Sequence, residues 1–189
     1  MKIGGSADVI VTEDKVPALI KAIQSLTNKR VMVGIPAEHA ERPDSEVTNA
    51  LIGYVLETGA PERNLPARPF LVPGVRNCTE DAMARMKQAG VSALMGNMSD
   101  VNNQLNAVGL MAAASVKDKM DTGPFVPLAN ATLEARVRRN DGAQVGAAEE
   151  LASRKAGNPP GTDLAQPLID TGNLQNSITY VIRDNRDRR

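Results

Sequence analysis

The sequence contains very few aromatic residues and a single cysteine. Aromatic residues account for 2% of the 189 positions, and tryptophan is absent. Because aromatic side chains dominate core energetics where they occur, this core must be built from Ala, Leu, Val, Ile and the eight methionines. The lone Cys78 excludes an intrachain disulfide, which favours synthesis in a reducing, cytosolic compartment.

The chain also lacks net charge and long apolar runs. Its 22 basic and 22 acidic residues cancel, so the whole chain has no long-range field to attract nucleic acid or an anionic membrane. Any such partner would have to be held locally. No apolar run approaches the length of a bilayer-spanning helix, and the N-terminus lacks the apolar core of a signal peptide. We therefore expect no membrane partner.

Motifs that carry catalysis are missing from the sequence. There is no glycine-rich phosphate loop and no nucleophile elbow. The only histidine, His39, lies in the polar segment 36–45, and a metal or acid–base site would need a partner at workable spacing. The acidic pairs Glu13-Asp14 and Glu149-Glu150 have the character of solvated surface. We expect no catalytic residue, cofactor or metal; the enzymatic alternative is a hydrolase that uses His39.

Three short runs predict strands. Residues 7–12 and 30–35 are rich in β-branched side chains. Residues 177–183 alternate, with Ile178, Tyr180 and Ile182 on one face. We expect an α+β fold in one domain, 1–189, with a small, mostly antiparallel sheet packed against long helices.

Apolar periodicity predicts the helices. The first is capped by Thr12 or Asp14 and ends near residue 27, and a short one covers 130–139. A long segment, 79–120, breaks at 96–100 into two helices or one kinked helix. Its apolar stripes should be core, with a subunit seam as the alternative. The stripes are Met83, Met86, Val91 and Leu94, then Val101, Leu105, Val108, Met111, Ala112, Val116 and Met120.

A further helix is expected to run from Ser45, as its cap, to Gly59, where helices often end. Its predicted apolar face consists of Val47, Ala50, Leu51, Tyr54 and Val55.

Two segments are expected to be exposed. Residues 140–166 contain few large apolar side chains, which predicts an extended excursion that is flexible in the free monomer. Residues 184–189 form a polar tail.

Four prolines stiffen segment 58–73 and disfavour helix there. Either Phe70 and Leu71 fill the core from a rigid connector, or the rigid loop is a contact surface. Further on, Asp170, Thr171 and Gly172 are suited to a tight turn before the last strand.

Four separated blocks resemble the signature motifs of phage tail-completion proteins. They are Glu57-Thr58-Gly59-Ala60, the run Leu-Pro-Ala-Arg-Pro-Phe-Leu at 65–71, Phe-Val-Pro-Leu-Ala-Asn-Ala-Thr at 125–132, and 167–179, which contains Pro-Leu-Ile-Asp-Thr-Gly-Asn-Leu. The family comprises lambda minor tail protein Z, the Mu-like virion morphogenesis proteins and related tail components of long-tailed phages. The blocks keep the family order, although Ala129 stands where the family usually has Ser.

The resemblance implies a structural virion protein and no enzyme. A protein of this kind is expected to form a homo-oligomeric ring, hexameric by expectation, at the head-proximal end of the tail or neck. It completes the tail and supports head–tail joining. Its partners would be the tail tube or terminator and the head connector, with DNA passing through the lumen, and it would be made in the host bacterial cytoplasm. A ring needs head-to-tail contacts, for which the proline segment and 140–166 are the candidates.

Eleven block residues are the candidate assembly contacts. They are Arg68, Pro69, Phe70, Leu71, Pro127, Leu128, Leu168, Asp170, Thr171, Gly172 and Leu174. The hypothesis is that the Arg68 guanidinium forks onto the 170–172 turn or onto an adjacent subunit. The rival interpretation is a connector protein that lines a DNA channel. Its basic residues would be Arg136, Arg138, Arg139 and the C-terminal arginines Arg183, Arg186, Arg188 and Arg189.

Overall fold

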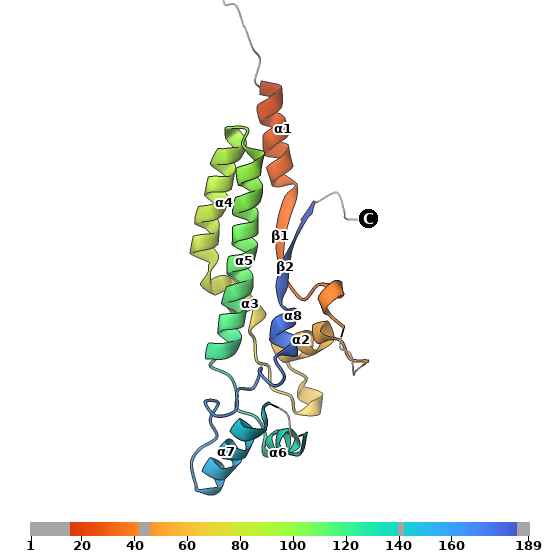
Figure 1. Ribbon diagram of the computed structural model, residues 1–189, viewed down its shortest axis with the longest axis vertical. Helices are drawn as coiled ribbons and strands as arrows, with labels where there is room; N and C mark the ends of the chain where they lie inside the picture. Colours follow the sequence, from red (N-terminus) through yellow and green to blue (C-terminus); the bar gives the residue numbers. More distant parts are fainter. Residues whose placement is uncertain (1–15, 42–45, 140–141, 185–189) are drawn as a thin grey trace, which may run out of the picture.

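The computed structural model describes residues 16–41, 46–139 and 142–184. The molecule is long and narrow: a helical hairpin of α4 and α5 runs beside a two-stranded sheet, with α1 at one end and the α6–α7 pair at the other (Figure 1). The elements in chain order are α1 (Val16–Thr27), β1 (Lys29–Gly34), the 3-10 helix η1 (Ala37–His39), α2 (Asn49–Thr58), the 3-10 helix η2 (Pro61–Arg63), α3 (Leu71–Asn77), α4 (Thr79–Leu94), α5 (Met98–Thr122), α6 (Asn130–Arg139), α7 (Gln144–Lys155), α8 (Asn173–Ser177) and β2 (Thr179–Asp184).

The α+β class is confirmed, and the sheet joins the beginning of the described chain to its end. β1 and β2 pair antiparallel, with Lys29 opposite Asp184 and Gly34 opposite Thr179. Asp184, expected to begin the polar tail, is therefore the last residue of a strand; 185–189 lie outside the described residues. So do the predicted strand at 7–12 and the caps Thr12 and Asp14.

The predicted alternation along the last strand is confirmed, and the face with Ile178, Tyr180 and Ile182 packs on the rest of the fold. Ile178, just before the strand, is 1% exposed in a cluster with Phe70 and Met120. Ile182 packs against a second cluster formed by α4 and α5. Tyr180 lies over Gly109 of α5, and its hydroxyl donates to Asn106 Oδ1 at 2.9 Å.

The long helical segment consists of two helices. Gly96, with φ of 76°, follows α4, and the Asn97 side chain caps α5 by accepting from the Asp100 N–H at 3.1 Å. The α5 stripe is core as predicted. Its buried members are Val101, Leu105, Val108, Ala112, Val116 and Met120.

The α4 stripe is not core in the single chain, which corrects the prediction. Met83 is 67% exposed and Leu94 56% exposed. The face of α4 that meets α5 is lined instead by the small residues Ala89 and Ala93, which are buried. Small side chains let the two helix backbones approach closely, so the larger apolar side chains of α4 point outward.

Two predicted details of α2 are wrong. Its cap is Thr48 and not Ser45: the Thr48 hydroxyl accepts from the Leu51 N–H at 3.2 Å. Its inner face is formed by Ile52, Gly53 and Leu56, while much of the predicted face is exposed. Gly53 lies close to the side chains of Ile35, Phe70 and Leu174, so the helix approaches the core through the one residue without a side chain. Gly59 ends the helix at φ of 77°, as predicted.

The segment 140–166 is not simply extended, because residues 144–155 form α7. Ala147 is fully buried in a small cluster with Leu128, Leu133 and Ala165, to which α6 also contributes. The sequence did not predict α7 because the side chain that it buries, Ala147, is too small to stand out as an apolar residue. From Asn158 to Asp170 the chain returns without regular secondary structure. None of the described helices is long and apolar enough to cross a membrane.

Gly109→Ala should destabilise the protein by about 1–3 kcal/mol, because a Cβ would overlap the Tyr180 ring and force β2 away from α5. Gly90→Ala is the matched control: it lies in α4 with no atom near the added methyl, and should stabilise by about 0.5–1 kcal/mol. Urea unfolding of both variants measures the difference. Equal effects would show that the Tyr180 ring does not pack on Gly109.

Candidate functional site

The four sequence blocks meet where two parts of the molecule join. We call α6 and α7 the lobe, and the elements packed around α5 and the sheet the body. Two linkers, 123–129 and 156–172, connect them, and the lobe has its own small apolar cluster. We call the contacts that hold these linkers the lobe junction.

Glu57 joins the first two blocks. Its Oε2 accepts hydrogen bonds from the N–H groups of Phe70 and Leu71 at 2.7 and 2.8 Å, and its Oε1 accepts from Val72 N–H at 3.0 Å. These amides begin α3, so a carboxylate lies where the helix dipole favours negative charge. Pro73 lies in the first turn of α3, where proline is tolerated. The expectation that the whole proline segment disfavours helix is therefore wrong at its end.

Arg68 holds the linker that leads into the lobe. Its side chain is buried, with 6% exposed. Its Nε donates to the Val126 carbonyl at 2.9 Å and Nη2 to the Pro127 carbonyl at 3.2 Å. The Arg68 bonds therefore go to the third block, and the predicted bond to the 170–172 turn is wrong. Burial lowers the pKa of Arg68, and the nearby positive charge of Arg136 lowers it further.

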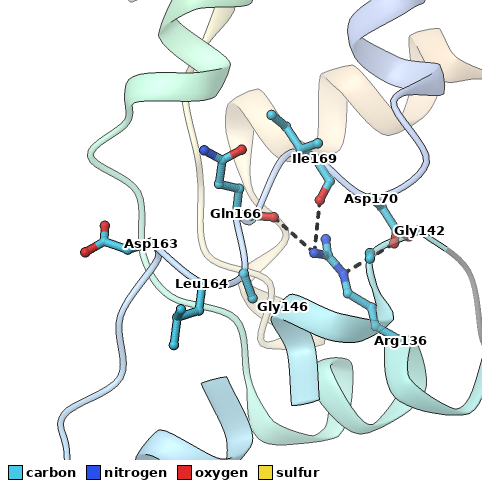
Figure 2. A pocket seen from close by; sticks show the side chains of 10 residues that line it. Arg136, Gly142, Gly146, Asp163, Leu164, Gln166, Ile169 and Asp170 are labelled. Carbon is cyan, nitrogen blue, oxygen red and sulfur yellow. Dashed lines mark hydrogen bonds and ion pairs between the residues drawn. The ribbon is translucent and has the colours of Figure 1, made fainter. Parts of the chain in front are cut away.

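Arg136 holds the linker that leads back to the body (Figure 2). This guanidinium, 5% exposed, donates from Nη1 to the carbonyls of Gln166 and Ile169 at 3.1 and 3.0 Å, and from Nη2 to Pro167 at 3.4 Å. Its Nε lies 3.5 Å from a carboxylate oxygen of Asp170. One α6 side chain thus binds most of the turn that carries the last block.

Asp170 is bound by the lobe. Arg139 Nη2 lies 2.8 and 2.6 Å from its two carboxylate oxygens. Gly172, with φ of 77°, follows and begins α8. The positive φ predicted for Gly172 is confirmed, but the Asp170 carboxylate binds arginine side chains. The partners of the turn are Arg136 and Arg139 instead of Arg68.

Within the lobe, Glu150 and Arg154 form a buried pair. Glu150 is 3% exposed, and its Oε1 accepts from Arg154 Nε and from the Gly161 N–H, both at 2.8 Å. Arg154 also donates to the Leu128 carbonyl at 2.8 Å. Burial raises the pKa of the Glu150 carboxyl, but these hydrogen bonds and the Arg154 charge outweigh it, so the pKa lies below its ordinary value. The prediction that Glu150 is merely solvated is wrong.

The predicted contact residues gather at this junction, and most of their apolar side chains point inward. Phe70, Leu168 and Leu174 share the main core cluster, with Leu71 packed against it, and Leu128 lies in the lobe cluster. Phe70 and Leu71 therefore fill the core, as the rigid-connector alternative predicts, while residues 61–67 of the same segment are exposed. Pro127 is half-buried, whereas Pro69 and Thr171 are exposed. Sequence reasoning missed Glu57 as a site residue, although it opens the first block.

The basic residues of the DNA-channel interpretation do not act as one cluster. Arg136 and Arg139 are used on the 166–170 turn, whereas Arg138 and Arg183 are exposed. Arg186, Arg188 and Arg189 lie outside the described residues. His39 is exposed, as expected. Among the described residues there is no group of three His, Cys, Asp or Glu side chains that could hold a metal ion.

Comparison of the chain with protein-family models, with curated proteins and with solved structures found no match.

Arg136→Ala should destabilise the protein by about 2–4 kcal/mol, since the carbonyls of the return linker would lose a charged donor in a largely buried place. Arg138→Ala, two residues along the same helix and exposed, should change stability by no more than about 0.5 kcal/mol. Urea unfolding gives both values. A small loss for Arg136→Ala would show that apolar packing, not the guanidinium, holds the lobe.

The Glu150 carboxyl predicts acid sensitivity of the lobe. Because its pKa is depressed below 4.5 in the folded protein, its stabilising contribution is present above that pH and is lost as the pH falls through the folded pKa. Glu150→Gln should lower stability at neutral pH and flatten the fall of stability at acid pH. The exposed neighbour Glu149→Gln should keep the wild-type pH profile. Urea midpoints across the pH series test this, and identical slopes for the two variants would contradict it.

Proposed function

We propose that this protein is a structural virion protein of a tailed phage. It forms a ring at the head-proximal end of the tail or neck, where it completes the tail and supports head–tail joining. By the family resemblance, we expect the ring to be a hexamer. Its partners are then copies of itself, tail tube or terminator proteins and the head connector. The localisation proposed is the virion.

The lobe junction carries the proposal. Residues of the family blocks take part in these contacts: Glu57 of the first block binds the second, and Arg68 of the second binds the third. The fourth block is bound by Arg136 and Arg139 of α6, which lie outside the blocks. Motif residues engaged in backbone hydrogen bonds serve to fix a shape. An assembling component must present a fixed shape to its neighbours.

Exposed apolar side chains on the outer helices give independent support. Every residue of α1 is exposed or half-buried, including Val16 at 58% and Ile20 at 50%. On α4, Met83 and Leu94 are exposed as well. Neighbouring exposed apolar side chains favour contact with another protein surface. A closed ring needs two different surfaces on each copy, and two outer helices can supply them.

The mass of the purified protein in solution tests the proposal, measured by light scattering behind a sizing column, alone and with isolated tails. A ring-sized multiple of the 20.1 kDa chain, or a monomer that joins tail ends stoichiometrically, is the expected result. A monomer indifferent to tails and connectors would contradict it.

Ile20→Glu should reduce assembly or tail binding without unfolding the chain, because it places a charge on the exposed apolar stripe of α1. Ala18→Glu adds the same charge elsewhere on the helix surface and is the matched control. Circular dichroism verifies folding of both variants. Equal assembly of the two would show that α1 is not the contact.

A further inference from the structure

A second polar site lies away from the lobe junction, where η1, the start of α2 and α8 meet. Residues of the three elements and Glu41 line an open surface pocket of about 310 Å³, and Figure 1 shows α2 and α8 beside each other at this place. Its lining consists entirely of polar residues. They are Glu38, His39, Glu41, Asn49, Asn173, Asn176 and Ser177.

Asn49 provides a buried hydrogen-bond acceptor in the pocket wall. The residue is 4% exposed, and its backbone N–H donates to the Ala40 carbonyl at 2.7 Å. Its side-chain Oδ1 is fully buried and accepts no hydrogen bond from any described residue. The buried neighbour Ser177 differs, because its hydroxyl donates to the Leu174 carbonyl at 2.7 Å. Buried carbonyl oxygens nearly always accept a hydrogen bond, so a ligand that donates one to Asn49 Oδ1 would satisfy this atom.

The rim of the pocket is negatively charged. Glu38 and Glu41 are exposed at its edge, together with Asn173 and Asn176, and no Lys or Arg of the described chain lines it. Carboxylates and carboxamide oxygens accept hydrogen bonds, and a positively charged donor satisfies both kinds. The volume is at the lower end of small-molecule sites, which suits a side-chain-sized group better than a cofactor.

We propose that this pocket binds a guanidinium or primary ammonium group. The chain already uses this recognition internally: the guanidiniums of Arg68, Arg136 and Arg154 each donate to backbone carbonyl oxygens in buried or half-buried places. The pocket offers the same kind of acceptor, Asn49 Oδ1, beside two carboxylates. Such a cation can come from an arginine or lysine of another protein chain, or from a free polyamine. The inference goes beyond the proposed ring and does not depend on it.

Titration with methylguanidinium chloride, followed by NMR of the Asn side-chain amides, tests the pocket directly. The expected result is saturable binding that shifts the amide signals of Asn49, Asn173 and Asn176. Glu38→Gln combined with Glu41→Gln should weaken binding by about fivefold, from the loss of two exposed charge pairs. The double variant Glu62→Gln with Glu80→Gln changes the net charge equally at exposed positions elsewhere and should bind like the wild type.

The Asn49→Asp variant is a second test, because it is expected to strengthen binding, and a gain in affinity cannot result from damage to the fold. A carboxylate in the first turn of α2 agrees with the helix dipole and gives the cation a charged acceptor, so binding should tighten by about fivefold. Unsaturable binding, or equal weakening by the two double variants, would overturn the proposal. So would weaker binding by a folded Asn49→Asp protein.

Two further measurements distinguish the sources of the cation. If Glu38→Gln with Glu41→Gln also lowers the assembled mass or the binding to tails, the cation is a side chain of another chain. If assembly is unchanged and spermidine binds in the same pocket more tightly than methylguanidinium, it is a free polyamine. A protein that stays monomeric and indifferent to tails but binds methylguanidinium would contradict the ring and leave the pocket proposal standing.

Discussion

Backbone carbonyls in irregular, buried chain need donors that regular secondary structure would otherwise provide. In the two linkers between body and lobe, arginine side chains provide these donors. Arg68 binds carbonyls of the outward linker, and Arg136 binds carbonyls of the return linker. A guanidinium suits the task because its donors are fixed in a plane and reach several carbonyls at once. The position of the lobe therefore depends on these polar contacts as well as on the linker side chains Phe125 and Leu168, which pack in the main core.

The two guanidiniums are near enough for the charge of one to lower the pKa of the other. Among the described residues, Arg136 but not Arg68 has a carboxylate within ion-pair distance; it belongs to Asp170, which also pairs with Arg139. Carbonyl dipoles consequently supply much of the compensation for burying these charges. An arrangement of this kind tolerates little change, because loss of either partner leaves polar groups uncompensated in a place with little water.

Sequence reasoning succeeded where large side chains repeat with the period of their element, as on α5 and around Ile178 and Ile182. It failed where small residues make the contact. Ala89 and Ala93 on α4 and Ala147 on α7 are buried, but alanines at these positions do not produce a hydrophobic pattern that predicts it. It also failed for Arg136, because adjacent arginines look alike in sequence. The acceptors of Arg136 are backbone carbonyls 30 to 33 residues away, which leave no mark in the identity of any side chain.

The chain enters and leaves the lobe at one place on the body. Gln175 of α8 donates to the Asp121 carboxylate at the end of α5, and Gln166 of the return linker donates to the carbonyl of the same residue. A pull on the lobe is therefore divided between two parallel linkers, each with its own arginine anchor. One linker continues directly into α5 and the other, through α8, into β2, so tension reaches both the long helix and the sheet.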